Sequence, residues 1–264
     1  VATNASVTGQ SNQTNPQSSI SQTLTNNTNQ VQTVVYTVTP TSGAQGGCVG
    51  STFTITVTVN PKPVLPPQSQ TICSGGTFTL TPTNAQPTTI IPANTTYIWT
   101  VVDNPNVTGE SDQASPQSSI SQTLTNLTNQ SQQVVYTVTP TSGAQGGCVG
   151  SPFTLTVTLS SRPAITDKTD VICSGGTFSV TPQNGGAELV PSGTVYTWTV
   201  AANANVSGES NQATAQPSIS QTLTNLTNQV QTVVYTVTPS VNGACAGNTF
   251  TVTVTVNPKP VIPA

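Results

Sequence analysis

The chain has 264 residues, of which only four are Lys or Arg and seven are Asp or Glu, and it contains no His and no Met. So few cations exclude a surface that neutralises nucleic acid or anionic lipid, and no apolar run approaches the ~20 residues of a membrane span, so neither nucleic acid nor a membrane is expected as a partner. Without His, and with sparse carboxylates, the usual general bases and metal ligands are missing, which predicts a protein that is not an enzyme and holds no metal or cofactor.

The chain is built of repeats with a period of about 100 residues. Residues 17–58 recur at 117–158 with changes only at positions 27, 31, 33, 52 and 55, and a shortened third copy begins at Gln216. The period divides the chain into the last two thirds of a truncated repeat at 1–63, complete repeats at 64–163 and 164–260, and the start of a further linker at 261–264. We therefore expect a section of a longer array.

Short segments within each repeat alternate apolar and polar residues. In chain order, the first complete repeat has them at 78–80, 97–101, 107–109, 120–124, 134–138 and 153–159. Alternation with a period of two places apolar side chains on one face of a strand and hydroxyls on the other. Turn sequences rich in Gly, Pro and Asn lie between these segments, and none of them has the period of an amphipathic helix.

Six or seven short strands in about 100 residues predict an all-β fold of immunoglobulin-like β-sandwich domains. A β-solenoid is the alternative, but its period is nearer 20 to 30 residues. Trp99 and Trp198, with Tyr136 and Tyr235, alternate with outward residues and are expected in the core; sugar stacking is the alternative for the two Trp. The Pro-rich junction at 60–63 stops the last strand and forms an extended spacer, so the sandwiches are expected to be strung end to end.

Five cysteines lie at 48, 73, 148, 173 and 245. We expect disulfides inside each complete repeat, Cys73 with Cys148 and Cys173 with Cys245, while Cys48 pairs with a residue before the sequence begins. Such bridges form in an oxidising compartment, and free buried thiols are the alternative. A disulfide needs Cα atoms within ~7 Å, whereas seven alternating strands place Cys73 about 25 Å from Cys148. The pairing therefore requires residues 64–71 to be mainly linker, or a strand number other than seven. Pairing Cys48 with Cys73 across the junction fits worse, because the strand at 53–59 carries the chain a whole domain length away.

An acidic cluster follows the Trp-containing segment. Asp103, Glu110 and Asp112 are candidates for calcium, which prefers several carboxylates. The third repeat keeps only Glu209 of these carboxylates, so an ordinary solvated loop is the simpler interpretation.

Rows of Thr and several Asn-x-Ser/Thr sequons are two further candidates. A flat row of Thr suits an ice- or crystal-binding face, but sandwich strands twist, so a hydroxyl-rich outer face is the simpler interpretation. The sequons, among them Asn94, Asn126 and Asn225, are about as frequent as the composition predicts and give no support to glycosylation.

Several short motifs recur in phase: Ile-Cys-Ser-Gly at Ile72 and Ile172, Tyr-x-Trp-Thr at Tyr97 and Tyr196, Gln-Thr-Leu-Thr-Asn at Gln122 and Gln221, Tyr-Thr-Val-Thr-Pro at Tyr136 and Tyr235, and Thr-Val-Thr-Val-Asn-Pro-Lys-Pro at Thr253. Together they resemble the PKD-like repeats of very large surface proteins of the Bacteroidota. The Trp-Asp-Phe-Gly-Asp-Gly core of ordinary PKD domains is absent, so the likeness is to a divergent branch. The resemblance implies export by the type IX secretion system and a role as adhesin, gliding-motility filament or cell-surface fibre, with no catalytic residues.

We therefore expect a segment of a long extracellular fibre at the cell surface. It would act as a spacer and make many weak contacts with polysaccharide or neighbouring fibre chains in attachment or gliding. Two alternatives stay open. One is a linker or carbohydrate-binding array of a secreted enzyme, and the other is a self-assembling filament subunit in which a strand of one copy completes the sheet of another.

Overall fold

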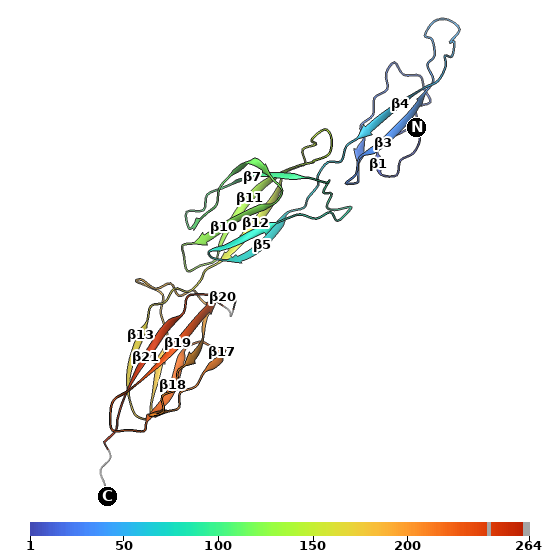
Figure 1. Cartoon of the computed structure of the whole chain (residues 1–264). Helices are drawn as coiled ribbons and strands as arrows, with labels where there is room; N and C mark the ends of the chain where they lie inside the picture. Colours follow the sequence, from blue (N-terminus) through green and yellow to red (C-terminus); the bar gives the residue numbers. More distant parts are fainter. Residues whose placement is uncertain (242–243, 261–264) are drawn as a thin grey trace.

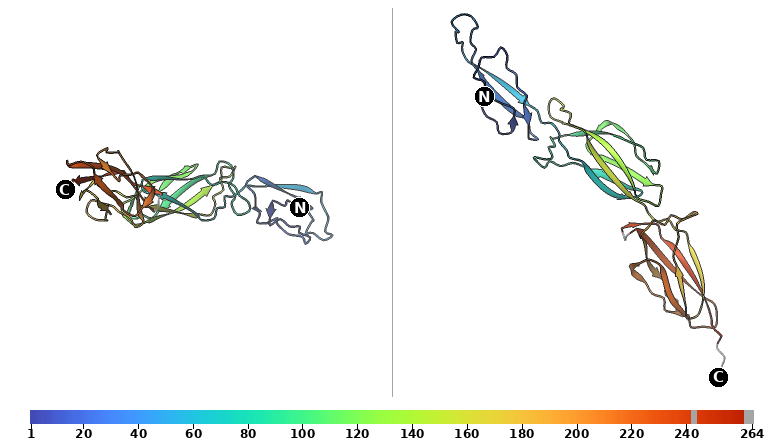
Figure 2. Two further views of the ribbon diagram at one scale, coloured as in Figure 1. Left: turned by 90° about the horizontal axis from the view of Figure 1, so that it is seen from below. Right: turned by 180° about the vertical axis from the view of Figure 1, so that it is seen from behind.

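A computed structural model describes residues 1–241 and 244–260; the expected start of a further linker at 261–264 lies outside them. Every secondary-structure element assigned within these ranges is a β-strand. Over the same residues, the structure contains no helix with the length and apolarity needed to cross a membrane. Three β bodies follow one another in an elongated molecule (Figure 1), and the same order is seen from below and from behind (Figure 2). We call them the first domain (β1–β4), the second domain (β5–β12) and the third domain (β13–β21).

The second domain is an immunoglobulin-like sandwich of a five-stranded and a three-stranded sheet. The larger sheet has the order β5–β12–β11–β7–β9 and the smaller has the order β6–β10–β8. All neighbours are antiparallel except β5 and β12, which are parallel. The strands are β5 (Gln68–Cys73), β6 (Gly76–Leu80), β7 (Thr96–Val101), β8 (Val107–Thr108), β9 (Gln113–Gln117), β10 (Ile120–Asn126), β11 (Gln132–Thr141) and β12 (Phe153–Ser160).

The core of this sandwich comes from the period of two. On β12 the four apolar side chains from Phe153 to Leu159 are buried, while the alternate Thr side chains are exposed or half-buried. Trp99 on β7 is only 5% exposed, and its Nε1–H donates to the carbonyl of Ser111 at 3.1 Å. Tyr136 on β11 is buried, and its hydroxyl donates to Gln122 Oε1 at 2.8 Å. Both aromatic side chains therefore place their rings in the core, while the polar group of each forms a hydrogen bond.

The third domain repeats this plan. Its larger sheet has the order β13–β21–β19–β15–β17, with β20 paired to β19, and its smaller sheet has the order β14–β18–β16. Trp198 and Tyr235 are buried and donate to Ser210 and Gln221, as their counterparts do in the second domain. The strands are β13 (Lys168–Cys173), β14 (Gly176–Val180), β15 (Thr194–Val200), β16 (Val206–Ser207), β17 (Gln212–Gln216), β18 (Ile219–Asn225), β19 (Gln231–Val241), β20 (Cys245–Ala246) and β21 (Phe250–Asn257).

The first domain has β1 (Val7–Thr8) paired with β2 (Thr25–Asn26), and β3 (Gln32–Val38) paired with β4 (Phe53–Val59). Its described residues include no counterparts of β5, β6 and β7. Phe53 is consequently 48% exposed, whereas Phe153 at the same place in the second domain is 4% exposed. The inner face of this domain is therefore partly open to solvent.

The structure confirms the all-β sandwich and adds two strands that the alternation missed. β5 occupies half of the segment 64–71 that the within-repeat disulfide required to be mainly linker, so that expectation is wrong. β9 lies at an edge of the larger sheet, and most of its side chains are exposed. β5 has the greater consequence for the cysteines. It runs parallel to β12, so that Cys73 lies at the same end of the domain as the last residue of β12.

Candidate functional site: the domain junctions

The end of the second domain from which the chain leaves is built around Cys73. This residue closes β5 and lies opposite Ser160, the last residue of the parallel strand β12. The next residues cross between the sheets: the Ser74 amide donates to the Ser160 carbonyl and the Gly75 amide to the Leu124 carbonyl, both at 2.8 Å. Gly75 has φ +75°, which favours glycine. The turn therefore fixes Cys73 at what we call the exit end.

The end of the third domain at which the chain enters carries Cys245. This residue begins the short strand β20 and pairs with Val241 on β19, just before the last strand begins. Cys245 is 6% exposed. The pairing of β20 with β19 therefore holds a buried cysteine at what we call the entry end.

A disulfide joins Cys73 to Cys245 across the junction between the second and third domains. The two Cα atoms are 5.5 Å apart, within the ordinary range for a disulfide. The bridge links the exit end of one domain to the entry end of the next.

The expected pairings of Cys73 with Cys148 and of Cys173 with Cys245 are therefore wrong. Cys148 lies in the loop before β12, at the entry end, while Cys73 lies level with the last residue of that strand. At ~3.3 Å per residue, the eight residues of β12 alone separate the two ends by about 26 Å, far beyond the ~7 Å limit for Cα atoms. The separation of the two ends of the domain is therefore the physical reason that no disulfide forms within the repeat.

The other three cysteines are unpaired in the structure. Cys173 closes β13 opposite Asn257, as Cys73 closes β5, and is exposed. Cys48 lies in the entry loop of the first domain and is also exposed. Cys148 lies at the entry end of the second domain and is partly buried. The pairing of Cys48 with a residue before residue 1 stays a prediction.

Glycine and proline pack against each other at both junctions. A Cβ atom on Gly150 would lie 2.6 Å from the Pro63 carbonyl oxygen, and one on Gly247 would overlap the carbonyl of Pro163. Each glycine lies two residues after the cysteine of its entry loop. Only glycine allows the loop to approach the Pro-rich linker this closely.

Backbone pairs fasten each linker to the domain that follows it. Val64 exchanges two hydrogen bonds with Ile90, at 2.9 and 2.8 Å, and Ala164 exchanges two with Leu189, both at 2.9 Å. These residues come directly after Pro63 and Pro163. The connection between domains therefore includes almost no free chain.

Glu188 secures the second of these linkers. Its carboxylate accepts hydrogen bonds from the Thr166 amide and hydroxyl and forms an ion pair with Lys168. Hydrogen bonding to Lys168 is the main cause that holds the pKa of Glu188 below its ordinary value. The hydrogen bond from the Thr251 amide likewise lowers the pKa of Asp167.

A buried asparagine organises the exit loop of each domain. Asn225 Nδ2 donates to the carbonyls of Gln229 and Val256 at 2.7 and 2.9 Å, and its Oδ1 accepts from the amide and hydroxyl of Thr227, both at 2.9 Å. Its backbone amide donates to Ser174 Oγ at 3.0 Å. Asn26 and Asn126 make the matching side-chain contacts in the other domains. The sequons at Asn126 and Asn225 thus place their amides in buried hydrogen bonds.

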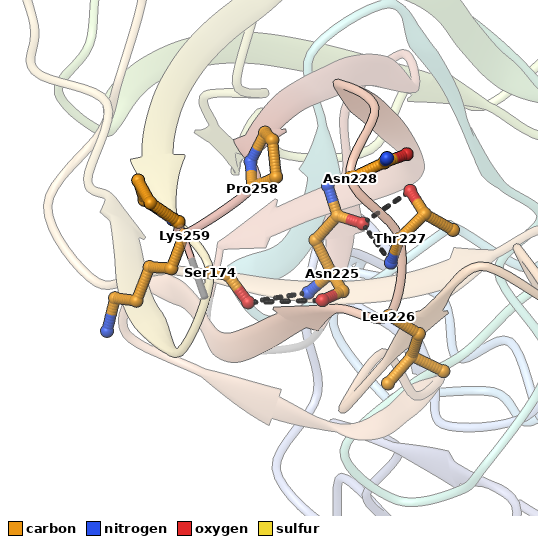
Figure 3. A pocket seen from close by; sticks show the side chains of 8 residues that line it. Ser174, Asn225, Leu226, Thr227, Asn228, Pro258 and Lys259 are labelled. Carbon is orange, nitrogen blue, oxygen red and sulfur yellow. Dashed lines mark hydrogen bonds between the residues drawn. The ribbon is translucent and has the colours of Figure 1, made fainter. Parts of the chain in front are cut away.

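The exit end of the third domain is hollowed. The hollow is lined by Ser174, residues 225–228 and residues 258–260. Figure 3 shows the hydrogen-bonded Ser174, Asn225 and Thr227 along its wall, with Pro258 and Lys259 beside them. The corresponding region of the second domain forms a hollow together with Pro191, Ser192 and Val241 of the third domain. The exit end of the second domain is thus faced by the third domain.

Two carboxylates of the acidic cluster, Glu110 and Asp112, accept hydrogen bonds from backbone amides. Asp112 Oδ1 accepts from the Val101 amide at 2.8 Å, and Asn211 Oδ1 accepts from the Val200 amide at the same distance. Because a neutral amide replaces the carboxylate with the same geometry, charge is not needed there. No group of three His, Cys, Asp or Glu side chains in the described part of the chain is placed to hold a metal ion.

A family comparison agrees with the division into three repeats. The model of the PKD-like domain family matches residues 1–63, 70–163 and 170–260. The curated proteins include no match. Similar solved structures include the I-band fragment I67–I69 from titin (7% identity, 90% of this chain and 91% of that chain, TM-score 0.32), chicken CNTN1 FN1–FN3 domains (14%, 84% and 75%, 0.32) and mouse cadherin-23 EC22–24 (10%, 86% and 74%, 0.27). The chain belongs to the PKD-like domain family, with three copies in tandem.

Proposed function

We propose that this chain is a spacer segment of an extracellular surface fibre, with side faces that make many weak contacts. Tandem immunoglobulin-like repeats are typical of extracellular spacer or adhesive segments, and such repeats are typically non-catalytic. The observation that carries the proposal is the junction between the second and third domains, where the Cys73–Cys245 disulfide closes a linker that is already tied at Ala164.

This junction favours a stiff rod over freely jointed beads. Bending at Pro163 would have to break the contact with Gly247 and the backbone pair between Ala164 and Leu189. The disulfide adds a covalent link between the facing ends of the two domains, beside the linker itself. A rod of this kind keeps whatever lies at its tip away from the cell.

The side faces suit weak adhesion. Hydroxyl pairs such as Thr77 with Thr123, at 2.6 Å, and Thr177 with Thr222, at 2.7 Å, lie on the exposed face of the smaller sheets. With only eleven charged residues in the chain, contacts with polysaccharide or neighbouring fibre chains would be mainly hydrogen bonds. Repeated copies would raise avidity without a strong single site.

The proposed location is the cell surface. A disulfide between domains persists in an oxidising environment, which supports an extracellular chain. The likeness to surface repeats of the Bacteroidota supports the finer proposal of an adhesin or gliding filament exported by the type IX secretion system.

Small-angle X-ray scattering of the full chain tests the spacer function. We expect a rod-like profile for the oxidised chain, and a shorter mean maximum dimension with a broader distribution for the Cys73→Ser/Cys245→Ser variant. Cys48→Ser, which leaves the junction intact, is the matched control. A compact globule in the oxidised chain, or identical profiles for all three proteins, would overturn the proposal.

Immobilised polysaccharides test the adhesive part separately. We expect weak binding by the single chain, stronger binding when many copies are displayed on one bead, and little change with salt. Binding that is equally tight for single chains and beads would instead indicate one dedicated site.

A further inference from the structure

Cys148 has the same place at the entry end of the second domain that Cys245 has in the third. Each lies five residues before the phenylalanine that begins the last strand and two residues before the glycine that packs against the linker. The residue after each cysteine pairs with the preceding strand in the same register, Val149 with Thr141 and the residue after Cys245 with Ser240. Cys148 is therefore the counterpart, in backbone position, of a cysteine that is bridged to the domain before it.

The loop of Cys148 contacts the exit end of the first domain. A Cβ atom on Gly146 would lie 2.6 Å from Asn60 Nδ2. Asn60 is the counterpart of Ser160, which lies opposite Cys73 where β5 and β12 end. An exit cysteine of the first repeat, opposite Asn60, would therefore lie beside the entry loop that contains Cys148.

Contact with the preceding domain also changes the surroundings of this loop. Residues 40–50 and 140–150 have the same sequence, and both loops close with a hydrogen bond from a serine amide to the cysteine carbonyl, at 2.8 and 2.9 Å. Cys48 is exposed, whereas Cys148 is partly buried and its loop packs against Pro63. The first junction is thus assembled like the second, with the loop of the entry cysteine at the contact between the domains.

Cys173 has the position at the exit end of the third domain that Cys73 has in the second. It lies opposite Asn257 in the parallel pair of β13 with β21. The Ser174 amide donates to the Asn257 carbonyl at 2.8 Å, which repeats the turn after Cys73 at the same distance. Cys173 is therefore placed as the exit half of a bridge.

We propose that, in the longer array that the repeats predict, Cys148 forms a disulfide with the exit cysteine of the first repeat and Cys173 forms one with the entry cysteine of the repeat that follows. Every junction then has the bridge that joins Cys73 to Cys245, so each domain is fastened covalently at both ends. The inference goes beyond the spacer function, which the single bridged junction of this chain already supports.

Each bridge forms by exchange with a small disulfide such as glutathione disulfide. The thiolate of one cysteine attacks the small disulfide, forms a mixed disulfide and releases one small thiol. The thiolate of the other cysteine then attacks the protein sulfur of the mixed disulfide, forms the bridge and releases the second small thiol. Two protein thiols are oxidised, and one small disulfide is reduced to two thiols.

The 264-residue chain with a copy of residues 64–100 fused before Val1 tests the bridge at Cys148. Val1 is the counterpart of Val101, so the copy completes the first repeat with the chain's own sequence. The copy carries Thr71→Val, a residue that the third repeat already has at this place, so the peptide with the copied cysteine has a distinct mass.

After oxidation in a glutathione redox buffer, peptide mass spectrometry should find the copied cysteine linked to Cys148, to about the extent that Cys73 is linked to Cys245. The number of free thiols should fall from three in the 264-residue chain to two, although the copy adds a sixth cysteine. A copied cysteine that bonds to Cys48 of its own repeat, or that stays free while Cys73–Cys245 forms, would overturn the inference.

Gly150→Ala distinguishes a bridge made by the junction from one made by random collision. Its methyl group would lie 2.6 Å from the Pro63 carbonyl oxygen, so in the extended chain it should lower the bridged fraction of Cys148 and leave Cys73–Cys245 unchanged. Gly43→Ala, whose methyl group would contact no atom within 4 Å, is the control and should change neither bridge. Equal bridging of Cys148 in all three extended chains would contradict its assignment to the junction.

A complete additional repeat tests the bridge at Cys173. This chain carries Cys148→Ser and has a copy of residues 68–163, with its own cysteines intact, after Ala264. Peptide mass spectrometry should find Cys173 linked to the copied entry cysteine, whose peptide differs in mass from that of Cys48. A free Cys173 in a chain whose added repeat resists protease would overturn the inference and leave the scattering test of the spacer function unaffected.

Discussion

Cys73 and Cys245 are 172 residues apart in the sequence, and their Cα atoms are 5.5 Å apart in space. This proximity follows from the parallel pairing of β5 with β12, which brings Cys73 to the end of its domain together with the chain that leaves it. The bridge therefore bypasses most of two sandwiches and joins their facing ends. The junction, rather than the interior of either domain, is the part of the molecule that sequence changes should affect most selectively.

Gly247→Ala should weaken the junction without weakening the third domain. Its added methyl group would overlap the Pro163 carbonyl, and overpacking of this kind costs about 1–3 kcal/mol. We expect formation of the Cys73–Cys245 bridge against glutathione to fall by roughly 5- to 150-fold, since 1.4 kcal/mol is a factor of ten. Thiol trapping followed by mass spectrometry measures the bridged fraction at equilibrium.

Gly43→Ala is the control for this change, because a methyl group there would contact no atom within 4 Å. It should leave the bridged fraction unchanged. Equal bridged fractions in the wild-type chain and in Gly247→Ala would show that the Pro163 contact does not position the two cysteines.

Asn225→Ala should destabilise the third domain by about 2–3 kcal/mol. The substitution removes two donors and one acceptor from a buried loop and leaves the Val256 carbonyl without that partner. Guanidinium unfolding of the full chain measures the loss. Asn228→Ala, three residues later on the exposed part of the same loop, should change stability by less than about 0.5 kcal/mol. Similar losses for both variants would contradict a specific role for the buried amide.

The sequence predicted the sandwich because its core strands carry an unbroken period of two. The segment from Phe153 to Leu159 alternates apolar residues with Thr, and the segment around Tyr136 does the same, so burial on one face was readable directly. β9 was missed because Gln113–Gln117 is polar, mostly exposed and contains a Pro. This edge strand is held by its pairing with β7, and its sequence has no alternation of apolar and polar residues that would indicate a strand.

The disulfide was mispredicted because cysteine spacing does not report strand direction. β5 reads Gln-Ser-Gln-Thr-Ile-Cys, with too few apolar residues to indicate a strand, and its parallel pairing with β12 is a tertiary feature. The usable signal was the distance between Cys73 and Cys148 expected for alternating strands. That distance argues against pairing within a repeat. Because the junction pair Cys48–Cys73 fits no better, the sequence did not single out the Cys73–Cys245 pair.

Acid should weaken the third domain partly through Glu188. Folding lowers its pKa, so its contribution to stability is present above the ordinary value of 4.5 and is lost as pH falls through the lower folded value. Glu188→Gln should therefore lower the unfolding midpoint at neutral pH and reduce its change on acidification. Asp170→Asn removes a carboxylate from β13 of the same domain and is the control. Parallel pH profiles for the wild-type chain and Glu188→Gln would contradict this assignment.

Pulling the chain from its two ends should show that the bridge limits its extension. In the oxidised chain, force passes from Cys73 directly to Cys245, so residues 74–244 carry no load even after β5 and β21 are pulled from their sheets. Removing the bridge adds to the extended chain the 172 residue-to-residue steps between Cys73 and Cys245, which at ~3.3–3.6 Å each amount to about 570–620 Å. Single-molecule force spectroscopy should show this added length in Cys245→Ser and in the reduced wild-type chain, whereas Cys48→Ser should match the oxidised chain. Equal contour lengths in the oxidised and reduced chains would mean that the bridge does not form between the domains. A tether under tension requires a limited extension, because each bridged junction then resists force through a covalent bond instead of through the hydrogen bonds of its sheets.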